Sequence, residues 1–145
     1  MTEEVLKLDN QICFPFYAMS RVIIRGYQPY LDKLGLTYTQ YLVMLVLWEQ
    51  DGLSVNEIAE RLILNTNTVT PMLKRMEGMG LLERIKGEAD ERKVFINITE
   101  KGQAMHEEAS RIPSQLLQAL NQEGKDLTDL LEMRDKINEL LHRGY

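Results

Sequence analysis

The sequence contains a single cysteine, Cys13, whose thiol is the side chain best suited to redox chemistry. A lone cysteine cannot form an intrachain disulfide. His106 and His142 lie far from it in sequence, so the spacing does not favour a zinc site, and no residue pattern requires a cofactor. A protein thiol is either a reactive thiolate stabilised by its surroundings or an inert, buried small hydrophobic group. The residues next to Cys13 leave both interpretations open.

A second group of residues has the polar and basic character of a surface that contacts DNA. Asn and Thr side chains can meet base edges or phosphates, and an arginine at the base of a loop can enter the negatively charged minor groove. Asp90 could hold Arg92 by a charge-assisted hydrogen bond. The alternative is a solvated helix cap followed by an ordinary charged β-turn. The candidate DNA contacts are Asn65, Thr66, Asn67, Thr68, Thr70, Lys74, Arg75, Arg84, Lys86, Asp90, Arg92 and Lys93.

Residues 54–98 supply the elements that would position this second group. The pattern Ser54-x-x-Glu57 is a capping box that starts a short amphipathic helix. A second helix starts within the polar run 65–68, some of whose side chains are expected to cap backbone amides, and it ends at two glycines. Two strands, 82–86 and 93–98, follow around a charged loop. Two helices and then a hairpin are typical of a winged helix-turn-helix.

The N-terminal helix would place Cys13 near its first turn. Apolar residues recur at helical spacing over residues 8–34. The helix either begins at Asp9 or Asn10 with a kink at Pro15, or begins near Cys13 with the proline in the first turn. Both alternatives put the thiol near the helix N-terminus, where the helix dipole favours negative charge.

The remaining segments are also expected to be helical, apart from residues 1–7, which are expected to be frayed. A helix capped by Thr37 is apolar almost all round and should be buried, with Trp48 in the core. Another helix starts at 99–102 and runs to about residue 121, bent at Pro113. The last helix, about 124–142, has more apolar surface than one chain can bury. A twofold partner chain would cover that surface; packing on the first helix is the alternative.

Composition agrees with a single globular domain of 145 residues that needs neither disulfides nor metal. We expect residues 37–98 to form the winged core and residues 8–34 and 100–143 to form dimerisation helices. The net charge of −5 opposes general affinity for nucleic acid, so positive charge must be concentrated locally. No segment is long and apolar enough to span a membrane, so membrane partners are not expected and a cytoplasmic location is.

Several motifs resemble those of the multiple-antibiotic-resistance regulator (MarR) family. TPMLKRME, GLLERI, DER and ITEKG occur in the family's order. Two further motifs are similar to those of the organic hydroperoxide resistance regulator (OhrR) branch: LDNQICF and YxPYLDKLGLTYTQYLVMLVLWE. The resemblance implies a mainly α-helical homodimeric repressor with a winged helix-turn-helix core. It also implies that the second helix of the pair enters the major groove of a pseudo-palindromic operator and that Arg92 enters the minor groove.

The resemblance also assigns roles to the sensor residues. Cys13 matches the reactive cysteine of this branch, and Tyr17, Tyr27 and Tyr38 match tyrosines that hydrogen-bond it, partly from the other protomer. The run Asn65-Thr66-Asn67 departs from the branch's usual acidic residue followed by Ser-Gly, so the operator can differ. Pro15 beside the cysteine is a second departure. The chain has no second cysteine. It therefore does not belong to the subtype of this branch that forms an intersubunit disulfide between two different cysteines.

Three functions follow as hypotheses. In the first, an organic hydroperoxide oxidises Cys13 to a sulfenic acid, which reacts with a small cellular thiol or is over-oxidised, and the DNA is released. In the second, a small aromatic ligand rather than oxidation releases the DNA. The third is a thiol peroxidase, but the sequence lacks the βαβ pattern of thioredoxin-like peroxidases, so we expect no enzyme. The ligand pocket of the second hypothesis would be lined by Met19, Tyr27, Tyr38, Tyr41 and Trp48.

Overall fold

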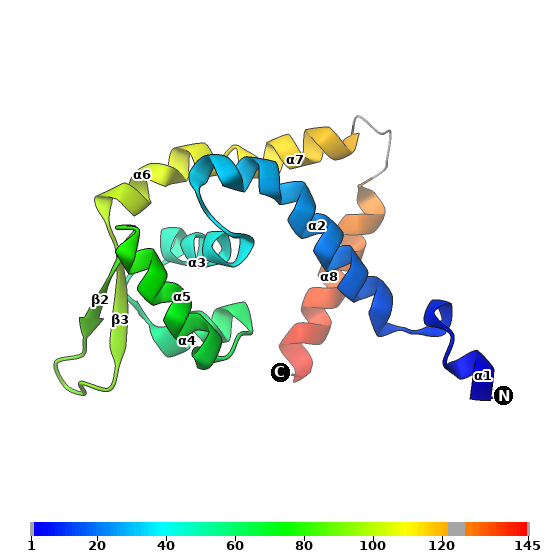
Figure 1. The fold of residues 1–145 in the computed structure, drawn as a ribbon, viewed down its shortest axis with the longest axis horizontal. Helices are drawn as coiled ribbons and strands as arrows, with labels where there is room; N and C mark the ends of the chain where they lie inside the picture. The colour runs from blue at the N-terminus through cyan, green and yellow to red at the C-terminus, as the bar shows by residue number, and fades with distance from the viewer. Residues whose placement is uncertain (1, 122–126, 145) are drawn as a thin grey trace. The chain divides into compact units, whose positions relative to one another are not determined.

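The computed structural model describes residues 2–121 and 127–144 and is mainly helical with one small sheet (Figure 1). The chain divides into two compact units, residues 1–38 and 39–145. The helices are α1 (Thr2–Val5), the 3-10 turn η1 (Leu8–Asn10), α2 (Cys13–Leu34), α3 (Tyr38–Glu49), α4 (Val55–Leu62), α5 (Thr66–Gly78), α6 (Glu100–Ala109), α7 (Ile112–Asn121) and α8 (Thr128–Gly144). The strands are β1 (Leu53–Ser54), β2 (Leu82–Lys86) and β3 (Val94–Ile98).

The first unit is built on the long helix α2, which begins at Cys13. Pro15 therefore lies in the first turn, where its missing N–H leaves no bond unmade. Of the two predicted starts, the later one is confirmed. The helix continues past Gly26 and Pro29 and ends at Leu34. Gly35 follows as its cap, with a positive φ of 70°, and its N–H donates to the carbonyl of Asp32.

The start of the chain differs from the expectation of frayed residues. A four-residue helix, α1, forms there. Its free carbonyls accept hydrogen bonds from side chains further along: Asn10 Nδ2 donates to the Glu4 carbonyl at 2.7 Å, and Gln11 Nε2 donates to the Val5 carbonyl at 2.8 Å. These side chains supply hydrogen-bond donors for carbonyls that find none within so short a helix.

The core of the second unit is built around α3. Five of the twelve residues of α3 are buried, as its nearly uniform apolar sequence predicts. Trp48 differs from the prediction, because it is only half-buried. Its indole N–H donates to the Gly102 carbonyl at 3.1 Å, and its ring meets His106 edge-on. Residues of α3, α4, α5, β2 and β3 with at most 1% exposure complete the core: Val43, Met44, Leu47, Ile58, Val69, Leu73, Met76, Leu82 and Ile96.

Helices α4 and α5 form the predicted helix-turn-helix. The capping box at the start of α4 is confirmed: Ser54 Oγ accepts from the Glu57 N–H at 3.2 Å, and the Glu57 carboxylate accepts from the Ser54 N–H at 2.7 Å. The turn between the helices passes through Ile63, which has a φ of 55°. A β-branched residue rarely adopts this left-handed conformation, so the turn is strained.

The sheet contains one strand more than the sequence predicts. Strands β2 and β3 form the expected antiparallel hairpin, which starts at Leu82 paired with Ile98. A two-residue strand, β1, adds to the other edge of β3, with Leu53 opposite Ile96. The strand order is β1-β3-β2, so the start of α4 is tied to the hairpin.

The segment predicted as one bent helix is two helices. α6 ends at Ala109 and α7 begins at Ile112. Pro113 lacks the N–H that would bond to the Ala109 carbonyl four residues earlier, so the break comes before the proline, which then occupies the first turn of α7. The last helix, α8, begins at Thr128. The predicted start near residue 124 lies outside the described residues.

Candidate functional site

Cys13 is exposed at the first position of α2. The first amides of a helix have no partners within the helix, so this is where its dipole favours a negative charge. Tyr17 follows one turn later on the same face of the helix. The guanidinium carbon of Arg21 lies 5.6 Å from the centroid of the Tyr17 ring. The thiol, the phenol and the cation thus follow one another along one side of α2.

Tyr27 and Tyr38 form a pair further along the first unit. Their ring centroids are 5.1 Å apart and their planes are inclined at 50°. Burial raises the pKa of both phenols above the ordinary value of 10.0, and the proximity of Tyr27 raises the pKa of Tyr38 further. Both groups therefore keep their protons and are hydrogen-bond donors throughout the physiological pH range.

The tyrosine pair cannot reach Cys13 of the same chain. Cys13 and Tyr27 both belong to α2, and the rise of 1.5 Å per residue separates their backbones by about 21 Å. Of the three tyrosines predicted to hydrogen-bond Cys13, only Tyr17 lies near the thiol. Contact between Cys13 and the Tyr27–Tyr38 pair therefore requires a second copy of the chain.

Helix α5 has one buried face and one exposed face, as the sequence predicts. Val69, Leu73 and Met76 are fully buried and fix the helix to the core. Asn65 precedes the helix, but its side chain makes no capping bond to any described residue, contrary to one expectation. The polar residues on the other side are available to a partner: Asn65, Thr66, Asn67, Thr68, Lys74 and Arg75 are exposed, and Thr70 is half-buried.

The loop between β2 and β3 holds its arginine as predicted. Asp90 Oδ1 accepts hydrogen bonds from the Arg92 backbone N–H at 3.0 Å and from Arg92 Nε at 3.3 Å. The Arg92 side chain is 92% exposed, so this bond orients the guanidinium without covering it. Lys86 and Lys93 are also exposed at the base of the loop.

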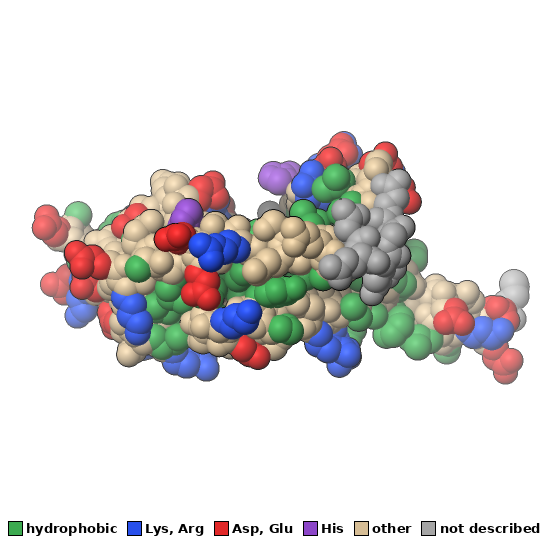
Figure 2. Space-filling model, turned by 90° about the horizontal axis from the view of Figure 1, so that it is seen from above, with side chains coloured by type: hydrophobic (Ala, Val, Ile, Leu, Met, Phe, Trp, Pro, Cys, Tyr) green, Lys and Arg blue, Asp and Glu red, His purple; other side chains and the backbone are tan. Residues whose placement is uncertain are grey.

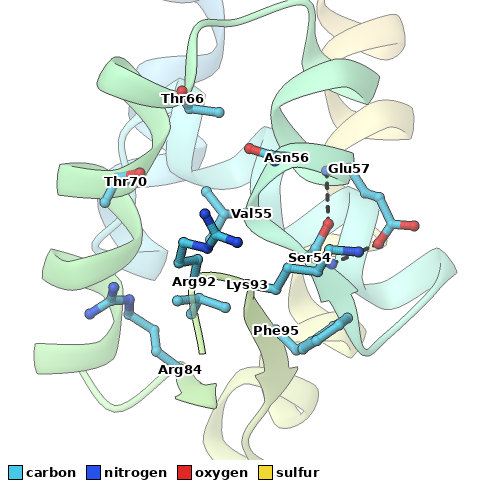
Figure 3. Close-up of a pocket in the computed structure, with 11 residues that line it drawn as sticks. Ser54, Val55, Asn56, Glu57, Thr66, Thr70, Arg84, Arg92, Lys93 and Phe95 are labelled. Carbon is cyan, nitrogen blue, oxygen red and sulfur yellow. Dashed lines mark hydrogen bonds between the residues drawn. The ribbon is translucent and has the colours of Figure 1, made fainter. Parts of the chain in front are cut away.

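A pocket of about 440 Å³ lies between part of α5 and the hairpin (Figure 3). Five of the predicted contacts meet there: Thr66, Thr70, Arg84, Arg92 and Lys93. Arg84 is half-buried, and among the described residues its Nε is a buried nitrogen without a hydrogen-bond partner. A cation with an unused donor beside two threonine hydroxyls is a setting that suits an anion such as a DNA phosphate.

The start of α4 contributes residues that the sequence analysis did not assign to this site. Ser54, Val55, Asn56 and Glu57 line the same pocket, as does Phe95 of β3. The pKa of Glu57 is lowered by hydrogen bonding from Ser54, first from its backbone N–H, and also by Lys93. The capping box is visible in the sequence, but its position beside the predicted DNA contacts depends on the pairing of β1 with β3.

Comparison with known proteins identifies the family. A model of the SarA/Rot transcriptional regulators matches residues 25–109. The organic hydroperoxide resistance transcriptional regulator of Bacillus subtilis (strain 168) is 46% identical over 138 residues, which cover 95% of this chain and 94% of that protein. The chain belongs to the OhrR branch of the MarR family.

Solved structures of another regulator resemble this MarR-type chain along nearly its whole length. Reduced AbfR bound to DNA has a TM-score of 0.80 at 34% identity, with 98% of this chain and 97% of AbfR covered. Overoxidised AbfR bound to DNA has a TM-score of 0.73, also at 34% identity, and covers 95% and 98%. The winged helix-turn-helix predicted from the sequence is thereby confirmed. The expectation of a transcriptional regulator rather than an enzyme is confirmed too.

The aromatic-ligand alternative gains no support from the positions of its residues in this MarR-type fold. Tyr41 is buried on α3, and Trp48 is engaged with Gly102 and His106. Met19 is exposed on α2. Two aromatic side chains of the predicted pocket thus contribute to the packing of the second unit. Among described residues, no helix could cross a membrane, and no group of His, Cys, Asp and Glu could hold a metal ion.

Proposed function

We propose that this protein is a homodimeric DNA-binding repressor that releases its operator when an organic hydroperoxide oxidises Cys13. The observation that carries the proposal is the position of the lone cysteine, exposed at the start of α2, in a chain 46% identical to an organic hydroperoxide resistance regulator. Such a regulator acts in the cytoplasm, where the DNA lies. The steps below follow from residues of this chain.

The thiolate of Cys13 attacks the outer oxygen of the hydroperoxide. An S–O bond forms and the O–O bond breaks, so the sulfur loses two electrons and becomes a sulfenic acid. The peroxide is reduced to an alkoxide, which takes a proton from water. A small cellular thiol then attacks the sulfur: an S–S bond forms, the S–O bond breaks, and water leaves. Since overoxidised AbfR has been solved bound to DNA, we assign release to this mixed disulfide rather than to over-oxidation.

The dimer supplies what one chain lacks. Exposed hydrophobic side chains gather at the start of α2 (Figure 2), where Ile12 is 82% and Phe16 59% exposed. Others lie on α8, where Leu140 is 64% exposed. A second copy would cover surface of this kind. It would also bring its Tyr27 and Tyr38 to the thiol, as protonated donors that stabilise the thiolate. A mixed disulfide adds bulk at that contact and would disrupt it.

The two DNA-reading surfaces would then bind one pseudo-palindromic operator. Helix α5 would enter the major groove with its polar start, residues 65–70, against the bases, while Lys74 and Arg75 meet phosphates. Arg92, braced by Asp90, would enter the minor groove. Arg84, Lys86 and Lys93 would bind the DNA backbone. Two half-sites one helical turn apart require the two reading surfaces to stand about 34 Å apart, so a change at the dimer contact weakens binding to both together.

The test is operator release, measured with a duplex selected from random DNA by the reduced protein. Fluorescence anisotropy follows binding to that duplex before treatment, after cumene hydroperoxide alone, and after cumene hydroperoxide with free cysteine. We expect the third treatment to release the DNA. Intact-mass spectrometry should show one added cysteine per chain on Cys13.

Cys13→Ser is the matched control, because it removes the sulfur and keeps a group of similar size. The variant should bind the duplex as tightly as the reduced protein and keep it under all three treatments. Release from Cys13→Ser by peroxide and thiol would overturn the sensor assignment. Failure of the random selection to enrich any duplex would instead contradict DNA recognition.

A further inference from the structure

The motif ITEKG contacts the C-terminal end of α5. The proposed function gives this motif no role. Lys101 Nζ donates to the Met79 carbonyl at 2.8 Å, and Thr99 Oγ1 donates to the Gly80 carbonyl at 2.6 Å. We name these two bonds the polar joint. Both acceptors lie just beyond the last turn of α5, where backbone carbonyls lack partners in the helix and where a cation is favoured by the helix dipole.

The polar joint belongs to a tightly packed corner. The Thr99 N–H donates to the Leu81 carbonyl at 3.1 Å, and Thr99 Oγ1 accepts from the Gly102 N–H at 3.1 Å, which caps α6. A Cβ added to Gly102 would lie 2.3 Å from the Leu81 carbonyl oxygen. Only glycine therefore allows α6 to start so close to the chain that leaves α5. The start of α6 has no room to shift independently of the end of α5.

We propose that Lys101 is a positioning residue for DNA reading, and that the polar joint sets the direction of α5 from α6. The inference rests on the proposed function, in which the start of α5 meets the bases. Lys101 itself lies at the opposite end of the helix from the predicted base contacts. It acts through the helix and does not contact DNA.

The length of α5 makes its direction sensitive to the polar joint. The helix has 13 residues and is about 20 Å long. A tilt of about 10° at its end moves its start by about 3 Å, roughly the length of a hydrogen bond. Base contacts tolerate no such displacement, whereas attraction to phosphates changes little over it. Loosening the polar joint should therefore reduce specificity more than general affinity.

The experiment compares Lys101→Met with Lys101→Arg, which can still donate to the carbonyl, and with Lys33→Met. The last variant removes the same charge near the end of a different helix, α2. Anisotropy measures the Kd of each reduced protein for the selected duplex and for a scrambled duplex of equal length and composition. Because a displaced α5 weakens its base contacts, we expect about fivefold weaker binding of Lys101→Met to the selected duplex, roughly the loss of one base contact. Its binding to the scrambled duplex should change less than about twofold.

Lys101→Arg and Lys33→Met should retain the wild-type ratio of the two Kd values. The inference is overturned if Lys101→Met weakens binding to both duplexes equally, since charge alone then explains the loss. An equal effect of Lys33→Met would overturn it too. These outcomes require a duplex that the wild-type protein prefers; if none is found, the proposed function itself fails.

Discussion

At the scale of single residues, the proposed mechanism depends on the protonation state of the tyrosines. A phenol can stabilise a thiolate only as a hydrogen-bond donor, so it must keep its proton. Burial gives Tyr27 and Tyr38 that property by raising the pKa of both. Each chain by itself therefore keeps both phenols protonated, without a second copy.

The raised pKa values predict how the tyrosines titrate. Tyr27 and Tyr38 should ionise at higher pH than ordinary tyrosines, which an ultraviolet absorbance titration measures. Because the folded state holds their protons more tightly, their contribution to stability is fully present below pH 10.0 and is lost as the pH rises through the folded values. Tyr27→Phe should remove one late step and bring Tyr38 nearer its ordinary pKa. Simultaneous ionisation of all tyrosines would contradict this.

At the scale of elements, local hydrogen bonds set where the helices of the winged core begin and end. Ser54 and Glu57 start α4 through reciprocal bonds, and Thr99 caps α6. Ile63 ends α4 in a left-handed conformation that its side chain disfavours. Two predictions follow from these termini, one for a bond that stabilises and one for a conformation that costs stability.

Ser54→Ala should lower the free energy of unfolding by about 1 kcal/mol, because the Glu57 N–H loses its acceptor. Denaturant titration at neutral pH measures this. The pKa of Glu57 is lowered in the fold from 4.5, so its contribution is present above pH 4.5 and is lost as the pH falls through the folded value. The stability difference between wild type and Glu57→Gln should accordingly shrink in acid. A difference independent of pH would contradict the role of the carboxylate.

Ile63→Gly should raise the free energy of unfolding by about 0.5 kcal/mol. Relief of the left-handed strain gives about 1–2 kcal/mol, from which the extra flexibility of glycine in the unfolded chain takes about 0.5–1 kcal/mol. The side chain is 53% exposed, so little buried surface is lost. Ile63→Ala removes most of the same side chain but keeps the Cβ, and it should gain less. A glycine variant less stable than wild type would show that the isoleucine makes a compensating contact.

At the scale of the whole molecule, the proposed function requires two copies. The backbones of Cys13 and Tyr27 are about 21 Å apart along α2 of one chain, and hydrophobic residues of α2 and α8 remain exposed. A single chain thus leaves Cys13 far from the tyrosine pair and leaves hydrophobic surface uncovered. Dimerisation is the proposal that accounts for them together.

Leu131→Glu should therefore weaken the dimer while the fold persists. The side chain is 49% exposed in one chain, so a carboxylate is tolerated there, but a dimer contact would bury it at a high desolvation cost. Sedimentation velocity measures the oligomeric state, and circular dichroism the helix content. Lys136→Glu on the same helix is the control and should leave the oligomer unchanged. A wild-type protein that sediments as a monomer would refute the prediction.

Much of the fold could be predicted from the sequence, because helices and hairpins depend on local patterns. The capping box, the glycines that end α5 and the alternating apolar residues of β3 are all short-range signals. The break between α6 and α7 was missed because a helix can either bend at a proline or end before it, and periodicity alone does not decide between the two. Strand β1 has two residues and carries no periodic signal of its own.

The sequence by itself determined the residue types: one thiol, tyrosines, and polar and basic residues on a winged helix-turn-helix. Only the tertiary structure decided which of them meet. It gathers Thr66, Thr70, Arg84, Arg92 and Lys93 around one pocket, joins Lys101 to the end of α5, and separates Cys13 from the tyrosine pair. The physical reason is that side-chain identity and local periodicity are encoded in adjacent residues. Contacts between distant segments depend instead on how helices and strands pack.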